Sequence, residues 1–117
     1  MFQVRDNSEL TLRKQKDFNR VYKKGKSRGG KYVVVLYRKN NLGYTRTAFV
    51  SSKKVGNSVE RNRSRRLMKE SYYSFKGKVK ESYDIVFVAR NSINGASMNE
   101  VQHSLYGTLK SCGLLKE

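Results

Sequence analysis

Residues 46–75 read RTAFVSSKKVGNSVERNRSRRLMKESYYSF, an order that predicts a strand, a turn and a long amphipathic helix. The strand is expected over residues 46–52, where β-branched and aromatic residues gather. Gly56 and Asn57 form the turn, and Glu60 follows Asn57 at the spacing of a capping box. The helix should therefore begin after Asn57 and end at residue 75 or 76, before a glycine.

The helix predicted to begin after Asn57 has one face that can pack against the protein and one face that can be presented to a ligand. At about 100° per residue, small and apolar side chains share the packing face: Ser64, Leu67, Met68, Ser71 and Phe75. The presented face carries Asn62, Arg65, Arg66, Lys69 and Tyr73. Between residues 51 and 70, seven Lys or Arg stand against two Glu. Like charges four residues apart destabilise an isolated helix, so this density of cations indicates an anionic ligand.

Two apolar runs on either side of this stretch predict further strands. Residues 31–38 contain YVVVLY, and residues 83–89 read YDIVFVA, the most apolar run of the chain. Both are rich in β-branched and aromatic residues and too short for helices of their own. Turn-forming Asn and Gly residues at 40–43 lead us to expect a hairpin between residues 31–38 and 46–52. Residues 27–31 read as a loop.

Amphipathic segments near both ends predict two more helices. Residues 14–24 precede Gly25, a helix stop, and Ser97 with Glu100 forms a second capping box. The apolar stripes are Phe18, Val21 and Tyr22 in the first helix, and Val101, Leu105, Leu109 and Cys112 in the second. Leu10 and Leu12 suggest a short edge strand or an extended arm. The mixed order of helices and strands predicts an α/β (α+β) fold.

Composition indicates one domain, residues 1–117, with a polyanionic partner. The net charge is +17 and the pI is about 10.3, which favours nucleic acid, with an anionic membrane surface as the second possibility. Disorder is disfavoured because 37% of the residues are hydrophobic and 11% are aromatic. A lone Cys112 and a polar N-terminus predict a cytoplasmic protein. No apolar run reaches the length of a membrane span, and no obligate protein partner is expected.

Catalytic chemistry has little support in this sequence. The single histidine, His103, lies off the apolar stripe of its helix and reads as a surface residue rather than a general base. One His and one Cys cannot form a zinc site. The nine carboxylates are scattered, although the fold could bring some together. We therefore expect no catalytic residue and no metal site in the protein itself.

The cations of residues 51–70 favour binding over simple solvation for three reasons. Five of them follow the turn and four of these are arginines, which can hold phosphate through two parallel hydrogen bonds. Lys53 and Lys54 precede the helix, whose first turn offers free N–H groups. Asn62, between two arginines, can hydrogen-bond a base edge or a ribose. A solvated charged face remains the alternative.

These residues also resemble a specific signature, that of the bacterial ribonuclease P protein component. The matching positions are Lys53, Lys54, Gly56, Asn57, Val59, Arg61, Asn62, Arg65, Arg66, Lys69 and Glu70, and the family's Arg-Asn-Arg motif is similar to Arg61, Asn62 and Arg63. Residues 17–27, 31–37, 46–50 and 83–90 resemble the family's first helix, central strands and fourth strand. The resemblance therefore spans almost the whole chain.

The resemblance implies a fold and a ligand for the basic helix. The fold would be a two-layer sandwich of αβββαβα order, like a domain of a ribosomal protein. It would have a four-stranded sheet and an unusual left-handed βαβ crossover. The residues implied to contact the catalytic RNA are Lys53, Lys54, Asn57, Arg61, Asn62, Arg63, Arg65, Arg66 and Lys69. The RNA would carry out cleavage, with Mg²⁺ bound mainly by the RNA and the substrate.

The resemblance implies a second surface as well, a cleft that holds the single-stranded 5′ leader of precursor tRNA. Its aromatic residues would be Phe18, Tyr22 and Tyr37, with Leu36 as the alternative to Tyr37 in the neighbouring register. Stacking on single-stranded bases is worth about 1–3 kcal/mol per base. Phe18 and Tyr22 at i and i+4 are equally consistent with a helix that packs on a core.

The function implied is that of a protein subunit of ribonuclease P, which assists endonucleolytic removal of the tRNA 5′ leader. Two alternatives stand beside it. A non-enzymatic ribosomal or structured-RNA binding protein would share the charge but would not need an aromatic cleft. A self-sufficient protein nuclease would cleave with Mg²⁺ in the absence of RNA.

Overall fold

The sheet has four strands in the order β1-β2-β4-β3 within residues 11–116, the part of the chain that this computed structural model describes. The chain follows the order α1 (Gln15–Lys24), β1 (Lys26–Gly29), β2 (Val33–Lys39), β3 (Arg46–Val50), α2 (Ser58–Phe75), β4 (Tyr83–Ala89) and α3 (Met98–Ser111). Short 3₁₀ turns, η2 (Lys76–Lys78) and η3 (Asn91–Ile93), flank β4. This is the αβββαβα order that the resemblance implied.

Both predicted capping boxes are present. The side chain of Asn57 accepts a hydrogen bond from the Glu60 N–H at 2.9 Å, and the Glu60 carboxylate accepts one from the Asn57 N–H at 2.9 Å. Ser97 and Glu100 make the equivalent pair at the start of α3. Each box satisfies two backbone donors that a helix start would otherwise leave free. The starts of α2 and α3 were therefore predicted correctly.

The predicted hairpin between β2 and β3 is wrong, because β4 lies between them. Residues 33–39 of β2 pair antiparallel with 89–83 of β4, and residues 46–50 of β3 pair parallel with 84–88. Ile85, Val86 and Phe87 are all fully buried. A strand that is apolar on both faces is best placed at the centre of a sheet, where both faces can be covered. The loop over residues 40–45 therefore crosses the end of β4, and α2 connects the parallel pair β3 and β4.

β1 corrects the interpretation of residues 27–31 as a loop. Its four residues, Lys-Ser-Arg-Gly, are all exposed and pair antiparallel with residues 34–37 of β2. Such a strand has no apolar alternation for the sequence to reveal. Its charged side chains suit an edge position, where they discourage pairing with another chain.

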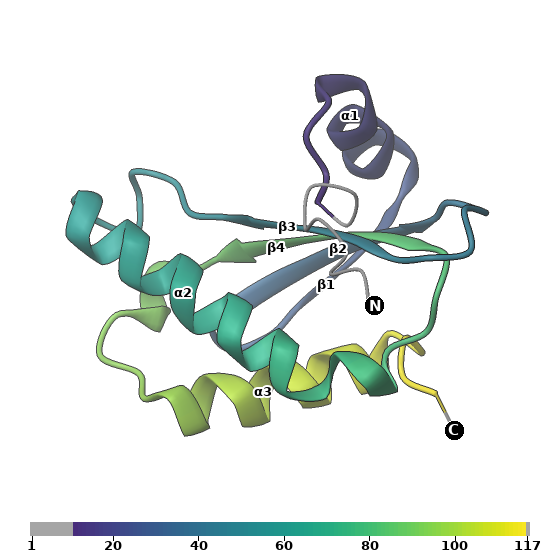
Figure 1. Ribbon diagram of the computed structural model, residues 1–117. Coiled ribbons are helices and arrows are strands. Elements are labelled where there is room, and N and C mark those ends of the chain that lie inside the picture. Colours follow the sequence, from purple (N-terminus) through teal and green to yellow (C-terminus); the bar gives the residue numbers. More distant parts are fainter. Residues whose placement is uncertain (1–10, 117) are drawn as a thin grey trace, which may run out of the picture.

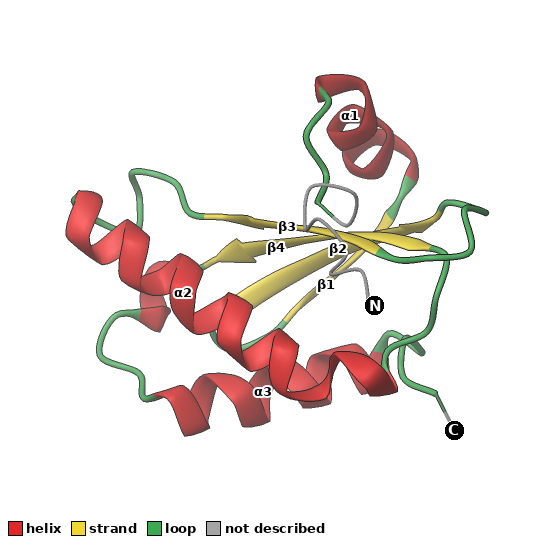
Figure 2. Ribbon diagram, viewed as in Figure 1, coloured by secondary structure: helices red, strands yellow, loops and turns green. Residues whose placement is uncertain are grey.

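Helices cover the two faces of the sheet unequally (Figures 1 and 2). α2 and α3 lie together across one face and form with the sheet the main two-layer sandwich, whereas the short α1 stands on the opposite face. The larger core contains Met68, Phe87 and Leu105, between the sheet and the α2–α3 layer. The smaller core lies under α1 and contains Leu12, Val21, Ala48 and Val86. The sheet therefore separates two surfaces that carry different side chains.

The chain ahead of α1 pairs for a short distance with the outer edge of β3. Thr11 forms a bridge with Thr47, and the Leu12 N–H donates to the Thr47 carbonyl at 2.9 Å. Leu12 is buried, in agreement with an extended arm or short edge strand. The prediction for Leu10 lies outside the described residues.

Candidate nucleic-acid interface

The two faces of α2 are those that the helical projection predicted. Ser64, Leu67, Met68, Ser71 and Phe75 are all buried. On the other face, Asn62, Arg66, Lys69 and Tyr73 are exposed and Arg65 is half-buried. Of the ion pairs between residues 11 and 116, none includes a cation of α2. The positive charge of this face is therefore available to a ligand.

Hydrogen bonds within the protein hold three arginines of the first turns of α2 in place. Arg61 Nη1 donates to the Gly56 carbonyl at 2.8 Å, and Arg63 Nη2 donates to the Ala96 carbonyl at 2.6 Å. Arg65 donates to Asn62 Oδ1. A guanidinium has five N–H donors, so each arginine can still donate to a phosphate. Fixed side chains lose less rotamer entropy on binding, so this part of the helix is pre-organised.

The turn before α2 has a buried anchor and an exposed cationic pair. Val55 is buried, and its carbonyl accepts from Asn94 Nδ2 at 2.6 Å. Lys53 and Lys54 beside it are exposed. Asn57 uses its side-chain oxygen in the cap, and its amide NH₂ group is left free to donate to a ligand. The helix cap is therefore a second reason, besides the predicted RNA contact, for an asparagine at this position.

A pair of hydrogen-bonded hydroxyls, which the sequence did not reveal, joins α2 to the residue that follows β3. Ser64 Oγ lies 2.8 Å from Ser51 Oγ and 2.8 Å from the Arg61 carbonyl oxygen. Ser64 is fully buried. Its small side chain lets the helix approach the strand, while both hydrogen bonds satisfy its hydroxyl. The only signal in the sequence was a serine on the apolar face.

On the opposite face of the sheet, α1 presents two aromatic rings side by side. The ring centroids of Phe18 and Tyr22 are 6.2 Å apart, with the planes 27° from parallel. Tyr22 is 46% exposed, whereas Phe18 packs against the smaller core. Phe18 is thus in part the core residue that the helical spacing allowed, and Tyr22 is the more accessible surface for a base.

Tyr37 does not join these two rings, so its predicted place beside them is wrong. Successive residues of a strand point to opposite faces. Tyr37 packs against the larger core, on the α2–α3 side, while its neighbour Leu36 packs with Phe18 against the smaller core. The alternative register, with Leu36 on the α1 face, is the one observed.

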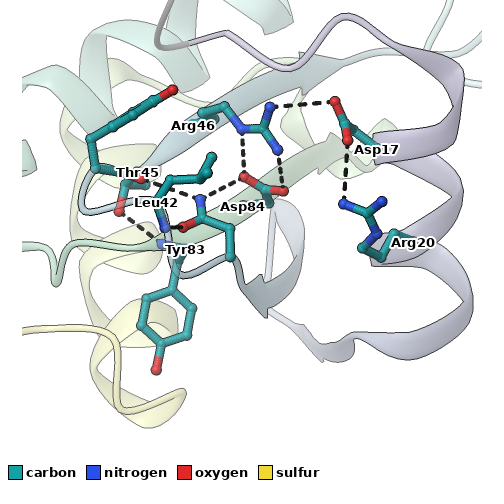
Figure 3. A network of polar contacts seen from close by, with 9 residues as sticks. Asp17, Arg20, Leu42, Thr45, Arg46, Tyr83 and Asp84 are labelled. Carbon is teal, nitrogen blue, oxygen red and sulfur yellow. Dashed lines mark hydrogen bonds and ion pairs between the residues drawn. The ribbon is translucent and has the colours of Figure 1, made fainter.

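An arginine between two carboxylates ties α1 to the sheet (Figure 3). Arg46 of β3 donates to both oxygens of Asp84 in β4, at 2.9 and 2.8 Å, and to Asp17 of α1 at 3.3 Å. Asp84 also accepts from Asn40 Nδ2 at 2.8 Å. Asp84 is 2% and Asp17 6% exposed. The hydrogen bonds to Asp84 raise the pKa of Arg46, so the cation stays charged and α1 keeps its position, with Phe18 next to the fixed Asp17.

Two absences among the described residues concern metal ligands and membrane-spanning helices. Within residues 11–116, no group of three His, Cys, Asp or Glu side chains is arranged to hold a metal ion. None of the helices in that range combines the length and the apolar character that crossing a membrane requires. His103 is exposed on α3.

Known proteins are similar to this chain in sequence, and solved structures are similar to it in fold. The family described as Ribonuclease P matches residues 7–113. The ribonuclease P protein component of Alkaliphilus metalliredigens is 44% identical over 108 residues, which cover 92% of this chain and 97% of the relative. That of Clostridioides difficile is 44% identical over 105 residues, with 89% and 92% covered.

Solved structures with this fold include two ribonuclease P proteins. One is a Staphylococcus aureus RNase P protein mutant with defective mRNA degradation activity, with a TM-score of 0.86, 30% identity, and 93% of this chain and 92% of that chain covered. The other, from Thermotoga maritima, has a TM-score of 0.79 and 32% identity, with 86% and 96% covered.

Proposed function

This chain belongs to the ribonuclease P protein family, and we propose that it is the protein subunit of a ribonuclease P holoenzyme. In that role it binds the catalytic RNA and the 5′ leader of precursor tRNA and assists Mg²⁺-dependent removal of the leader in the cytoplasm. The family membership of its close relatives disfavours a ribosomal protein as the alternative. The observation that supports RNA binding most directly is the cationic face of α2, whose charges no described acidic residue neutralises.

The face of α2 is the proposed contact with the catalytic RNA. Arg66 and Lys69 lie exposed on it, and Lys53 and Lys54 lie exposed just before it. Cations that neutralise phosphates release counterions, so RNA affinity should fall steeply with salt. Mg²⁺ is proposed to be bound mainly by the RNA and the substrate.

Reconstitution tests this role. A bacterial ribonuclease P RNA at low Mg²⁺ is given precursor tRNA, and the protein should restore release of the leader. The variant Arg66→Gln/Lys69→Gln should need more protein for the same effect and should show a smaller dependence of RNA affinity on salt, because fewer phosphates are neutralised. Lys78→Gln/Lys110→Gln changes the total charge equally at other exposed positions and serves as the control. Equal losses in both variants would show that only net charge matters.

The leader surface is tested by Tyr22→Ala. Tyr22 is exposed, so the variant should fold normally, yet the holoenzyme should lose part of its preference for precursor over mature tRNA. His103→Ala, an exposed change on α3, should leave that preference unchanged. Unaltered preference in folded Tyr22→Ala would refute leader binding at this ring.

A reaction without RNA completes the experiment. Because the similar Staphylococcus aureus protein is a mutant defective in mRNA degradation, purified protein with Mg²⁺ is tested on mRNA as well as on precursor tRNA. Cleavage of precursor tRNA under these conditions would contradict the assignment of chemistry to the RNA.

A further inference from the structure

Tyr37 lines a pocket at the end of the sheet that the proposed function does not explain. The pocket has a volume of about 220 Å³ and lies where α1 ends, β2 ends and β4 begins. Its charged and aromatic lining residues are Lys24, Lys26, Arg38, Lys39, Tyr37 and Tyr83. We call this site the Tyr37–Tyr83 pocket. Four cations and two aromatic rings meet there, and the lining contains no Asp or Glu.

The four cations of the pocket are not used within the protein. In the described part of the chain, none of them takes part in an ion pair. Lys24, Lys26 and Lys39 are exposed, and Arg38 is half-buried. The nearest carboxylate in the sheet register is Asp84, opposite Arg38, and it is buried and bonded to Arg46. The pocket therefore presents uncompensated positive charge.

The two tyrosines give the pocket flat apolar surfaces. Their ring centroids are 6.4 Å apart with the planes at 57°. Both side chains are half-buried and pack against the larger core, which holds the rings in fixed positions. Burial and the neighbouring Cys112 thiol raise the pKa of Tyr37, so its phenol is neutral at physiological pH. Fixed rings beside free cations are the combination that binds single-stranded nucleic acid, with bases stacked and phosphates neutralised.

The position of the pocket favours the leader on α1 over the catalytic RNA on α2 as its ligand. Lys39 pairs with Tyr83 at one end of the sheet, whereas β3 leaves for α2 at the other end, where Val50 pairs with Val88. The start of α2 is thus remote from the pocket along the strands. Lys24 and Gly25, in contrast, line the pocket at the C-terminal end of α1, the helix that carries Tyr22. RNA that follows α1 toward this end would meet the rim of the pocket next.

We propose that the Tyr37–Tyr83 pocket binds one further nucleotide of the precursor's single-stranded leader, beyond those that lie against α1. The phosphate is held by Lys24, Lys26 and Lys39, and the base lies against Tyr83. This inference rests on the proposed function, since it extends the leader path from one face of the sheet around its end.

The experiment measures holoenzyme affinity for precursor tRNA whose leader is lengthened one nucleotide at a time. The wild type should gain affinity at the length at which the next nucleotide reaches the pocket. Lys24→Gln/Lys26→Gln/Lys39→Gln and, separately, Tyr83→Leu should lose that increment, by at least about fivefold for one stacked base. Substrates with shorter leaders should bind alike. Lys76→Gln/Lys78→Gln/Lys110→Gln removes the same charge from exposed positions outside the pocket and should keep the increment.

A fluorescent base analogue, 2-aminopurine, at that leader position gives an independent readout. Its emission should be quenched in the wild-type complex and recover in Tyr83→Leu, whose folding is checked by urea unfolding. The lysine variant changes only exposed residues, so it tests the proposal even where Tyr83→Leu is unstable.

Three results would overturn the inference. An unchanged increment in the lysine variant would show that the pocket does not hold the leader. Equal losses at every leader length, or weaker assembly with the catalytic RNA, would assign the pocket to that RNA instead. A wild-type holoenzyme without any leader dependence would refute the proposed leader binding as a whole.

Discussion

Replacing Arg46 by methionine should destabilise the protein strongly, because it leaves the buried carboxylate of Asp84 without its cation and leaves Asp17 with only the long contact to Arg20. Asp84 and Asp17 are 2% and 6% exposed, and the Arg46 side chain is 17% exposed. Removing one partner of a buried ion pair costs about 3–5 kcal/mol, since the remaining charge is left uncompensated. That is a large part of the roughly 5–15 kcal/mol by which proteins of this kind are stable.

The structure also predicts how much folding stability related variants should lose. Arg46→Lys keeps the charge but cannot donate to both Asp84 oxygens as a planar guanidinium does, so about 1–2 kcal/mol should be lost. Arg20→Met removes only a long contact of 3.5 Å from a side chain that is 44% exposed, and should cost less than about 1 kcal/mol. Arg46→Met/Asp84→Asn should be less destabilised than the sum of its two single variants, because one uncompensated charge is removed.

Urea unfolding of the isolated protein, followed by far-ultraviolet circular dichroism, measures these differences. With a slope of about 1–3 kcal/mol per molar urea, Arg46→Met should lower the midpoint by at least about 1 M. The reasoning is refuted if folded Arg46→Met loses less than about 1 kcal/mol, or if the double variant loses the full sum. Either result would mean that water, rather than Arg46, solvates the carboxylates.

Two further predictions concern packing and ionisation. A Cβ at Gly25 would lie 2.5 Å from the Val21 carbonyl oxygen and 2.7 Å from that of Tyr37. Gly25→Ala should therefore cost about 1–3 kcal/mol of stability and lower the melting temperature by at least about 4 °C. Gly77→Ala, with open space around it, is the control, and equal melting temperatures of the two variants would contradict the close approach. Burial raises the pKa of Tyr72 to about 12 from 10, so the unfolded chain ionises first as pH rises, and the wild type should lose up to about 3 kcal/mol relative to Tyr72→Phe between pH 10 and 12. A pH-independent difference between these two proteins in urea unfolding would argue against that burial.

Elements with strong local signals were predictable from the sequence. α2 and α3 each begin with a capping box and continue with an apolar stripe, so local energetics and tertiary packing agree. β4 was identifiable by its continuous apolar run, but its central position was not, because pairing partners depend on the whole sheet. β1 escaped prediction because its side chains are all exposed and only its backbone pairing with β2 makes it a strand.

The residues of the candidate site also differ in whether a local sequence pattern could predict them. The exposed cations of α2 followed from helical periodicity, whereas Tyr37 required the strand register, in which a shift of one residue reverses the face of every side chain. Asp17 and Asp84 look like surface residues in the sequence. Their burial depends on Arg46, which lies 29 and 38 residues away from them in the chain, and no local pattern reports such a separation.

β4 also fixes the distance between the surface on α1 and the surface on α2. Val86 supports the core beneath α1, while Ile85 and Phe87 on either side of it support the core beneath α2 and α3. Neither helical layer can shift on this strand without disturbing neighbours of the other. The sheet thus acts as a rigid spacer of fixed thickness. Any two RNA segments bound on its opposite faces would be held at a set distance from each other.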